Sequence, residues 1–112
     1  MVKKSLIIER GDIVWIDFSP TRGHEQSGLR PAVVLSPLDY NTISGLAIVC
    51  PVTTKHKGYF FEVAIDGPKD RSFVLADQIR SIDIRNRVKK KDGRIKDAEV
   101  NEILAKSSVL FQ

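Results

Sequence analysis

The chain has 112 residues and a mass of 12.6 kDa, a length that predicts one domain over residues 1–112. Hydrophobic residues make up 42% of it and charged residues 29%, proportions that exclude a disordered, collagen-like or disulfide-stapled chain. The net charge is only +4 at pH 7, and the single cysteine, Cys50, excludes an internal disulfide and a cysteine-rich metal site.

The first ten residues predict no export signal. Lys3 and Lys4 precede a short apolar stretch at residues 6–8, which Glu9 and Arg10 interrupt. No apolar run comes near the ~18 residues that a membrane-spanning helix needs. We therefore expect a cytoplasmic protein with no membrane partner.

Six short strands are predicted between residues 13 and 84. Four are apolar or β-branched segments, at residues 13–18, 32–35, 46–50 and 72–76; a fifth, 60–65, alternates around Glu62, and residues 79–84 form the sixth. The unbroken apolar run 32–35 predicts burial on both faces, and Pro51 is expected to end the strand 46–50. Strands of this length and spacing predict a small antiparallel barrel or curled sheet.

Helical structure is predicted twice, and a turn once. Residues 37–41 suit one short turn because Pro37 favours a first helical position. Residues 91–94 have the composition of a turn. After them, Asp97 can cap a C-terminal helix in which Glu102 and Lys106 face outward at i,i+4 spacing. The expected apolar stripe of this helix is Val100, Ile103, Leu104, Leu110 and Phe111.

The positive charge is concentrated in residues 79–96, which hold eight basic and two acidic residues and so carry +6, while the remainder nets −2. A basic segment on a near-neutral domain is the electrostatic pattern of a polyanion binder. A solvated, lysine-rich edge that keeps a small sheet soluble explains the same charges. Charge alone leaves both interpretations open.

Three polar clusters are candidates for chemistry. The loop at residues 21–31 places His24, Glu25, Gln26 and Arg30 between two strands, and loops on a rigid scaffold are where sites usually lie. Taken singly, these residues also suit a surface role, in which Arg30 bonds carbonyl groups and Glu25 pairs with it. The second and third clusters follow later strands, and they suit phosphate contacts or, equally, a polar turn and a hairpin cap. They comprise Thr53, Thr54, Lys55, His56 and Lys57, and then Asp77 and Gln78.

No metal or cofactor is expected. His24 and His56 are the only histidines, and no carboxylate cluster accompanies them. No glycine-rich phosphate-binding loop follows a strand with the required pattern. The sequence therefore predicts a cofactor-free activity or none.

These clusters, in this order, carry a family resemblance. The segments are residues 11–15, the loop Gly23-His24-Glu25-Gln26-x-Gly28-x-Arg30-Pro31 with its apolar strand, residues 51–54, residues 57–59, and residues 76–81. From about residue 9 to the C-terminus the chain resembles the MazF/PemK family of toxin endoribonucleases. The most specific piece is the Glu-Gln-x-Gly-x-Arg-Pro loop entering an apolar strand.

The resemblance implies a mainly β fold, an SH3-like small antiparallel β-barrel with a C-terminal α-helix of the CcdB/PemK-like kind, and a homodimer. It implies sequence-specific cleavage of single-stranded RNA without a metal, leaving 2′,3′-cyclic phosphate and 5′-hydroxyl ends and inhibiting translation and growth. It also implies a cognate, MazE/PemI-like antitoxin with a disordered acidic tail.

The chemistry fits these residue types, because RNA supplies its own nucleophile, the 2′-OH. The protein must take up its proton, stabilise the phosphorane and protonate the leaving oxygen. We assign Arg30 and Thr53 to phosphate stabilisation, with Glu25 assisting; Glu25 or His24 is the candidate base. The candidate RNA-binding residues are His24, Gln26, Thr54, Lys55, Lys57, Asp77, Gln78 and Arg80.

One position departs from the family pattern. Some members carry an arginine two residues before the position of Asp77, where this chain has Leu75. Because this chain lacks that guanidinium, we assign the catalytic role to Arg30 more strongly, and Asp77 is left as a binding or structural residue.

Two other functions remain as alternatives. Toxins of the CcdB type share the barrel and bind DNA gyrase, but they lack the Glu-Gln-x-Gly-x-Arg-Pro loop. A plain nucleic-acid-binding barrel would use the basic segment 79–96 without catalysis. A nuclease, unlike a binder, needs Arg30 and Thr53 to converge on one phosphate.

Overall fold

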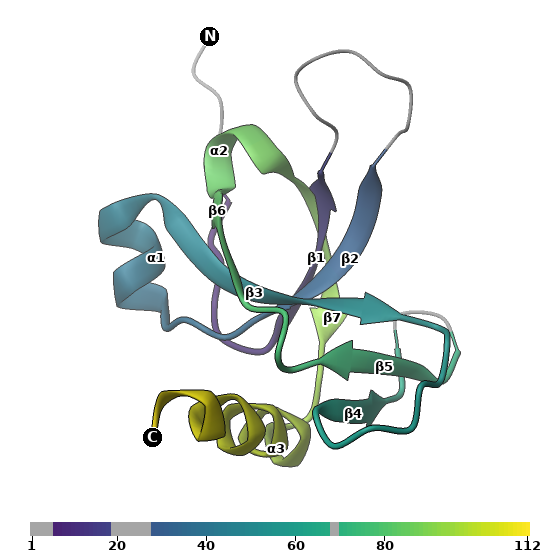
Figure 1. The fold of residues 1–112 in the computed structure, drawn as a ribbon. Coiled ribbons are helices and arrows are strands. Elements are labelled where there is room, and N and C mark those ends of the chain that lie inside the picture. The colour runs from purple at the N-terminus through teal and green to yellow at the C-terminus, as the bar shows by residue number, and fades with distance from the viewer. Residues whose placement is uncertain (1–5, 19–27, 68–69) are drawn as a thin grey trace, which may run out of the picture.

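A computed structural model describes residues 6–18, 28–67 and 70–112, which form seven strands, three helices and a final 3₁₀ turn (Figure 1). The elements are β1 (Asp12–Asp17), β2 (Leu29–Val34), α1 (Leu38–Ser44), β3 (Leu46–Thr53), β4 (Glu62–Ile65), β5 (Ser72–Leu75), β6 (Arg80–Asp83), α2 (Ile84–Arg87), β7 (Val88–Arg94), α3 (Asp97–Ser108) and the turn Val109–Phe111.

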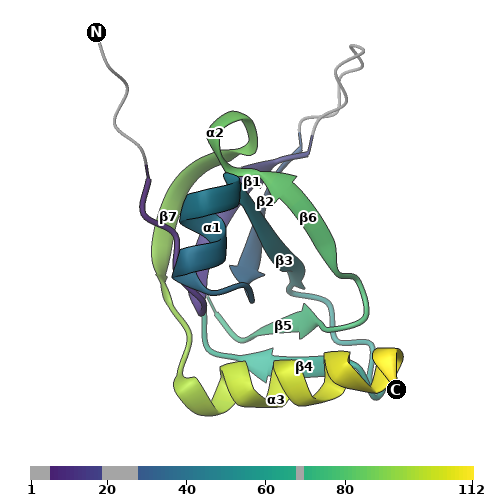
Figure 2. The ribbon, with the colours of Figure 1, turned by 90° about the vertical axis from the view of Figure 1, so that its left-hand side faces the viewer.

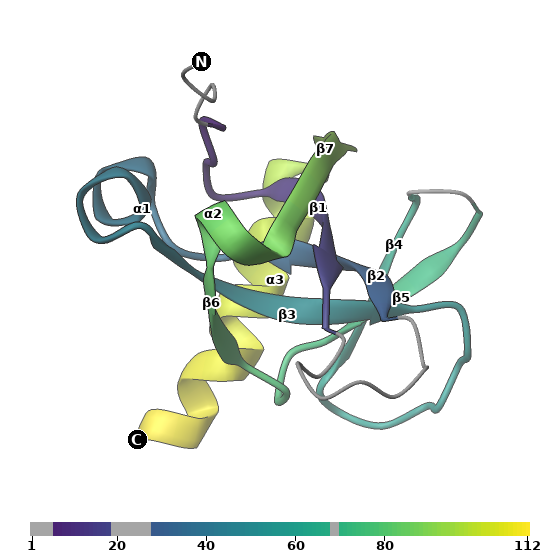
Figure 3. The same cartoon turned by 90° about the horizontal axis from the view of Figure 1, so that it is seen from above.

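The long strand β3 is the centre of the sheet. Its first four residues pair with β6, residues 49–51 in its middle pair with β2, and its last two residues pair with β5, all antiparallel. The order is β4-β5-β3-β2-β1-β7, and the strands cross β3 at widely different angles (Figure 3). The expected mainly β, antiparallel fold with a C-terminal helix is confirmed. Among the described residues β4 and β7 remain the ends of the sheet, so it curls without closing.

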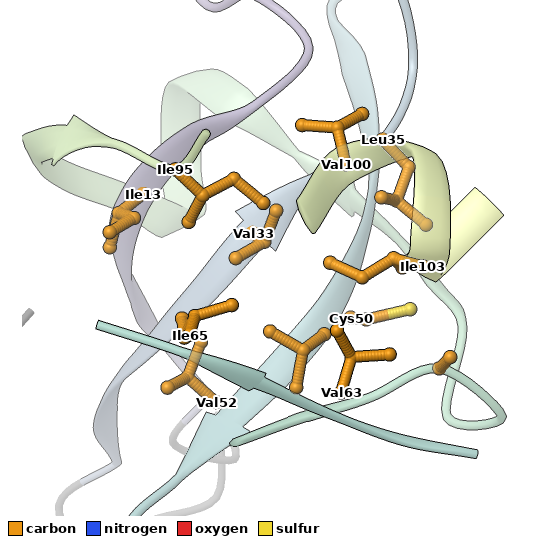
Figure 4. Packing of buried hydrophobic residues seen from close by; sticks show 12 residues of the cluster. Ile13, Val33, Leu35, Cys50, Val52, Val63, Ile65, Ile95, Val100 and Ile103 are labelled. Carbon is orange, nitrogen blue, oxygen red and sulfur yellow. The ribbon is translucent and has the colours of Figure 1, made fainter. Parts of the chain in front are cut away.

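The sheet has an apolar cluster on each face. The first core contains Ile13, Val33 and Cys50 and is covered by Ile103 of α3 (Figure 4). The second core is formed by Ile8, which precedes β1, and by other residues of the same strands and of β6 and β7, namely Val14, Ile16, Ala32, Val34, Ala47, Val49, Ile82 and Val88. Residues 32–35 alternate between the two cores, which confirms their predicted burial on both faces.

Two strands are longer than the sequence indicates. β2 begins at Leu29, two residues before Pro31, and β3 continues through Pro51 to Thr53. Proline removes one backbone donor, yet the ladder continues because Pro51 lies opposite Ala32 and Val52 lies opposite Val74. Thr53 is therefore a strand residue and not part of a loop.

The predicted turn at residues 91–94 is wrong, because these residues lie in β7, the seventh strand. Lys91 pairs with Val14 of β1, and Arg94 pairs with Asp12. The side chain of Arg94 also donates to the buried Asp12 carboxylate at 2.8 Å. This tertiary contact overrides the turn composition, and Gly93 adopts φ 84° within the strand.

The C-terminal helix matches its prediction in part. It begins at Asp97, so Lys96 and not Asp97 is the N-cap residue, and Glu99 accepts the backbone N–H of Lys96. Figure 2 shows α3 running alongside β4. Lys106 and Glu102 form the expected pair, at 3.4 Å.

The apolar stripe of this helix is shorter than predicted. Val100 and Ile103 are buried, whereas Leu110 is exposed and Phe111 is 76% exposed. The helix ends at Ser108, and the tighter 3₁₀ turn that follows takes these two side chains off the stripe. Two apolar side chains are left on the surface at this end of the chain.

Candidate active site

Arg30, Thr53 and Phe73 lie in one row across three neighbouring strands. Arg30 is opposite Ile16 of β1, and Thr53 is opposite Phe73 of β5. The β2–β3 ladder pairs Ala32 with Pro51, and the same register continued by two residues places Arg30 opposite Thr53. Residues directly opposite one another point to the same face of a sheet. The two principal catalytic candidates are therefore neighbours on one face.

The row lies where the second core ends. Ile16 and Ala32, on the same face, are fully buried, whereas Arg30 is exposed and Thr53 is partly exposed. The strands are held together by apolar packing on one side of this boundary and present polar groups on the other. A rigid, packed sheet thus positions Arg30 and Thr53.

Arg80 is on the same face as the row. It pairs with Val49 of β3, a second-core residue, and its guanidinium lies 4.7 Å from the ring centre of Phe18. Stacking of this kind holds a long cationic side chain over the surface. Of the cations in the basic segment 79–96, Arg80 is the one that the ladder places on this face beside β3.

Arg30 and Thr53 are both available to a ligand. No described residue forms a hydrogen bond or an ion pair with the guanidinium of Arg30. Thr53 Oγ1 accepts the backbone N–H of Lys55 at 3.1 Å, which leaves its own O–H to donate elsewhere. A planar guanidinium beside a hydroxyl donor can bind two or three oxygens of one phosphate.

The loop between β3 and β4 carries Thr54, Lys55 and Lys57, all exposed, and Glu62 fastens it. The Glu62 carboxylate accepts the backbone N–H groups of Lys57 and Gly58. Burial alone would raise the pKa of Glu62, but these two hydrogen bonds and the neighbouring His56 together outweigh it, and the pKa is lowered. The carboxylate is ionised at neutral pH and holds the loop in one shape.

Asp77 is joined to this loop and not to Arg30 or Thr53. The Tyr59 hydroxyl donates to Asp77 Oδ1 at 2.6 Å, and burial together with this carboxylate raises the pKa of Tyr59 to about 12. Gln78 is exposed beside it, and its backbone N–H donates to the Leu75 carbonyl. Leu75 itself is buried.

His24, Glu25 and Gln26 lie outside the described residues. The predicted roles of Glu25 or His24 as the base, and of Gln26 in binding, therefore stay predictions. They follow from the sequence, in which all three precede Arg30 by four to six positions.

Most of the basic segment is tied into the fold. Arg94 pairs with Asp12, Lys96 pairs with Asp66 at 3.0 Å, and Lys90 lies over the Trp15 ring. These contacts join β7 and the start of α3 to the rest of the sheet. They favour a structural role for much of the segment over a dedicated nucleic-acid surface.

Neither the cysteine nor a metal cluster offers other chemistry in the described part of the chain. Burial, with a smaller contribution from Asp77, raises the pKa of the Cys50 thiol to about 12, so it is no thiolate nucleophile at neutral pH. Across residues 6–18, 28–67 and 70–112, no three His, Cys, Asp or Glu side chains gather as metal ligands. The described helices are too short or too polar to span a membrane.

The sequence analysis missed Glu62, and it includes His56 in the second polar cluster without assigning it a role. The alternating pattern around Glu62 predicts a half-exposed strand, yet the Glu62 side chain is only 4% exposed. The available signal was its position four and five residues after the amides of Gly58 and Lys57, where a carboxylate can close a loop.

Comparison with known proteins decides the family. Residues 9–111 match the family of PemK-like, MazF-like toxins of type II toxin-antitoxin systems. The chain belongs to this family. It is 47% identical to the endoribonuclease toxin MazF of Escherichia coli K12 over 103 residues, covering 92% of this chain and 93% of that protein. It is 35% identical to the E. coli endoribonuclease PemK, covering 99% and 87%.

A solved structure agrees with the fold. A chain of a MazE–MazF crystal structure from Deinococcus radiodurans superposes with a TM-score of 0.86 at 40% identity, covering 96% of this chain and 97% of that one. The resemblance stated from the sequence motifs is thereby confirmed, and so is the fold class. CcdB-type gyrase binding has no support in these relatives.

Proposed function

We propose that the chain is a toxin endoribonuclease that cleaves single-stranded mRNA at short sequences without a metal ion. The observation that carries this is the row in which Arg30 and Thr53 are cross-strand neighbours at the open end of the second core. Its relatives MazF and PemK are endoribonucleases. A plain binder needs positive charge, but only a nuclease needs these two groups at one phosphate.

The reaction follows from the chemistry of RNA. A base removes the proton of a 2′-OH, whose oxygen attacks the adjacent phosphorus and forms the 2′,3′-cyclic phosphate, while the 5′-oxygen leaves with a proton. The Arg30 fork and the Thr53 hydroxyl stabilise the extra negative charge on the phosphorane. Glu25 assists, and Glu25 or His24 takes up the first proton.

Binding uses the polar groups around the row. Thr54, Lys55 and Lys57 lie on the loop that Glu62 fastens, and Arg80 lies on the same face as Arg30. The same role is proposed for His24, Gln26, Asp77 and Gln78. Unstacked bases of a single strand can reach such side chains with their edges, which a duplex does not allow.

A cognate antitoxin and a cytoplasmic location belong to this function. The MazF relative from D. radiodurans was crystallised with MazE, and a mycobacterial endoribonuclease, whose similarity at 21% identity concerns the fold, was solved with its cognate antitoxin. An acidic, disordered antitoxin tail would compete with RNA for the cationic surface. Messenger RNA as substrate places the toxin in the cytoplasm.

We also propose that the toxin is a homodimer joined through the apolar end of α3. A cavity of about 500 Å³ opens there, lined by residues that include Leu35, Tyr40, Ile48, Leu104 and Phe111. Phe111 is itself exposed, and so is its chain neighbour Leu110. Burying such a patch against a second copy is the common, two-fold solution for a small domain.

The test is cleavage of a long single-stranded RNA in excess EDTA, beside an all-DNA copy, with the ends mapped by sequencing. Discrete cuts in RNA alone, with cyclic phosphate ends, are expected, and Arg30→Ala should lose them while still melting at the parent temperature. Absence of cuts in EDTA, or cuts by Arg30→Ala within a few fold of the parent rate, would overturn the proposal.

A further inference from the structure

The imidazole of His56 lies at the end of the row formed by Arg30, Thr53 and Phe73. Its ring centre is 4.8 Å from that of Phe73, and the two planes are inclined by 31°. Phe73 is the residue opposite Thr53, so the row continues from Arg30 and Thr53 to the His56 ring over Phe73. Neighbouring strands are about 4.8 Å apart, which places His56 one step beyond Thr53 along this direction.

Glu62 fixes the orientation of this ring. His56 Nδ1 is 2.7 Å from Glu62 Oε1, and the carboxylate is almost fully buried while the His56 side chain is 68% exposed. The carboxylate accepts the Nδ1 proton, so the second ring nitrogen, Nε2, is the one left for another partner on this largely exposed ring. Figure 1 shows the β3–β4 loop, which carries this histidine, beside β5. The contact with Glu62 thus orients one imidazole on this loop.

We propose that His56 Nε2 binds an RNA phosphate next to the one held by Arg30 and Thr53, with Glu62 as its positioning residue. This rests on the proposed function, because it assigns a neighbouring subsite to the same RNA. An RNA strand that crosses β2, β3 and β5 meets the guanidinium and hydroxyl first and the imidazole next. A protonated imidazole between two anions, carboxylate and phosphate, donates through both nitrogens.

RNA binding at this subsite is coupled to protonation. Glu62 from β4 favours the charged ring, whereas Lys55 and Lys57 on its own loop and Arg71 of the β4–β5 turn oppose it; Arg71 lies 5.9 Å from the same Phe73 ring. A bound phosphate adds a second negative partner, so binding takes up a proton. Affinity for RNA is therefore higher at about pH 6 than at about pH 8.

The experiment measures binding separately from chemistry. The probe is an RNA with a 2′-O-methyl group at the cleavage site, which has no nucleophile, and its affinity is measured by fluorescence anisotropy at about pH 6 and pH 8. The variants are His56→Phe, which keeps a ring on Phe73, and His56→Lys, which carries a charge at both pH values. Lys96→Gln is the matched control, since it removes an exposed cation that pairs with Asp66.

We expect His56→Phe to bind about fivefold more weakly than the parent at the lower pH and to differ little at the higher one. Its slope of log affinity against log salt should fall by about 0.7 at the lower pH, the value for one phosphate on a single strand. His56→Lys should restore the affinity and lose the pH dependence that His56 contributes. Because the chain has a second histidine, His24, only the difference between parent and variant is used.

Equal binding by the parent and His56→Phe at both pH values would overturn the subsite. An equal loss of RNA affinity in Lys96→Gln would also overturn it, because the loss would then come from the total positive charge and not from a subsite. A fall in kcat in His56→Phe with unchanged RNA affinity would overturn it too, because His56 would then act in the chemical step. Failure of the proposed function has a different result, because it is absence of cleavage by the parent itself. Melting temperatures show whether His56→Phe folds. If it does not, the affinity of His56→Lys at the two pH values decides whether the subsite exists.

Discussion

Arg30 and Thr53 should act as one unit on one phosphate, and a double-mutant cycle tests this. The changes are Arg30→Ala, Thr53→Val and both together. Removing one preorganised donor to a developing oxyanion typically slows a reaction by about 10²–10³. The two residues are cross-strand neighbours, about 5 Å apart by ladder geometry, so both donors reach the same phosphate.

The cooperative case and the independent case differ greatly in rate. Independent groups would multiply to a loss of about 10⁴–10⁶, whereas a unit that fails when either member is removed loses about as much in the double variant as in one single variant. The gap of at least about 10² corresponds to a coupling of about 2.7 kcal/mol. Single-turnover cleavage of one short RNA in EDTA measures all four rates.

Two conservative variants serve as controls. Thr53→Ser keeps the hydroxyl that donates to phosphate and accepts the Lys55 amide, so its rate should stay within a few fold of the parent. Arg30→Lys keeps the charge and loses the planar fork, so its rate should fall between the parent and Arg30→Ala. Losses that multiply fully in the double variant would refute the convergence of Arg30 and Thr53.

Three further predictions concern the stability of the fold and the proposed dimer. Asp12→Ala should lower the free energy of unfolding by about 2–4 kcal/mol in urea, because it leaves the Glu9 amide and Arg94 without their buried acceptor; a loss below about 1 kcal/mol would contradict this. Burial and the bond to Asp77 raise the pKa of Tyr59 to about 12, so its neutral hydroxyl contributes stability below about pH 10 that is lost as the pH rises through about 12; Tyr59→Phe should abolish that loss in pH-dependent unfolding. Phe111→Lys should shift the protein from dimer to monomer in sedimentation, and a parent that is already monomeric at about 10 µM would refute the dimer.

Local patterns predicted the elements of this fold well where tertiary contacts agreed with them. The apolar run 32–35 is buried on both faces of the sheet. Val100 and Ile103 are the α3 residues that pack into the first core, as their spacing indicates. The failures came where a distant partner decided. Residues 91–94 became a strand because β1 and the buried Asp12 carboxylate lie beside them.

The candidate site was predicted as a set of residue types but not as a geometry. The sequence identifies Arg30, Thr53 and Asp77 as candidates without saying which of them meet. In the structure Asp77 instead binds Tyr59. Glu62 was missed because its importance lies in the loop amides it accepts, and no periodicity in the sequence encodes such a contact.

The second core explains why Arg30 and Thr53 meet. Side chains alternate between the two faces of a strand, so a slip of one residue between β2 and β3 would turn Thr53 to the opposite face from Arg30. The same slip would expose Ala32 or Val49, which are fully buried against one another's strands. Apolar packing therefore sets the register, and the register places a guanidinium beside a hydroxyl at the end of that packing. A polar substitution at Val49 should thus reduce stability and cleavage together, although Val49 carries no group that can touch RNA.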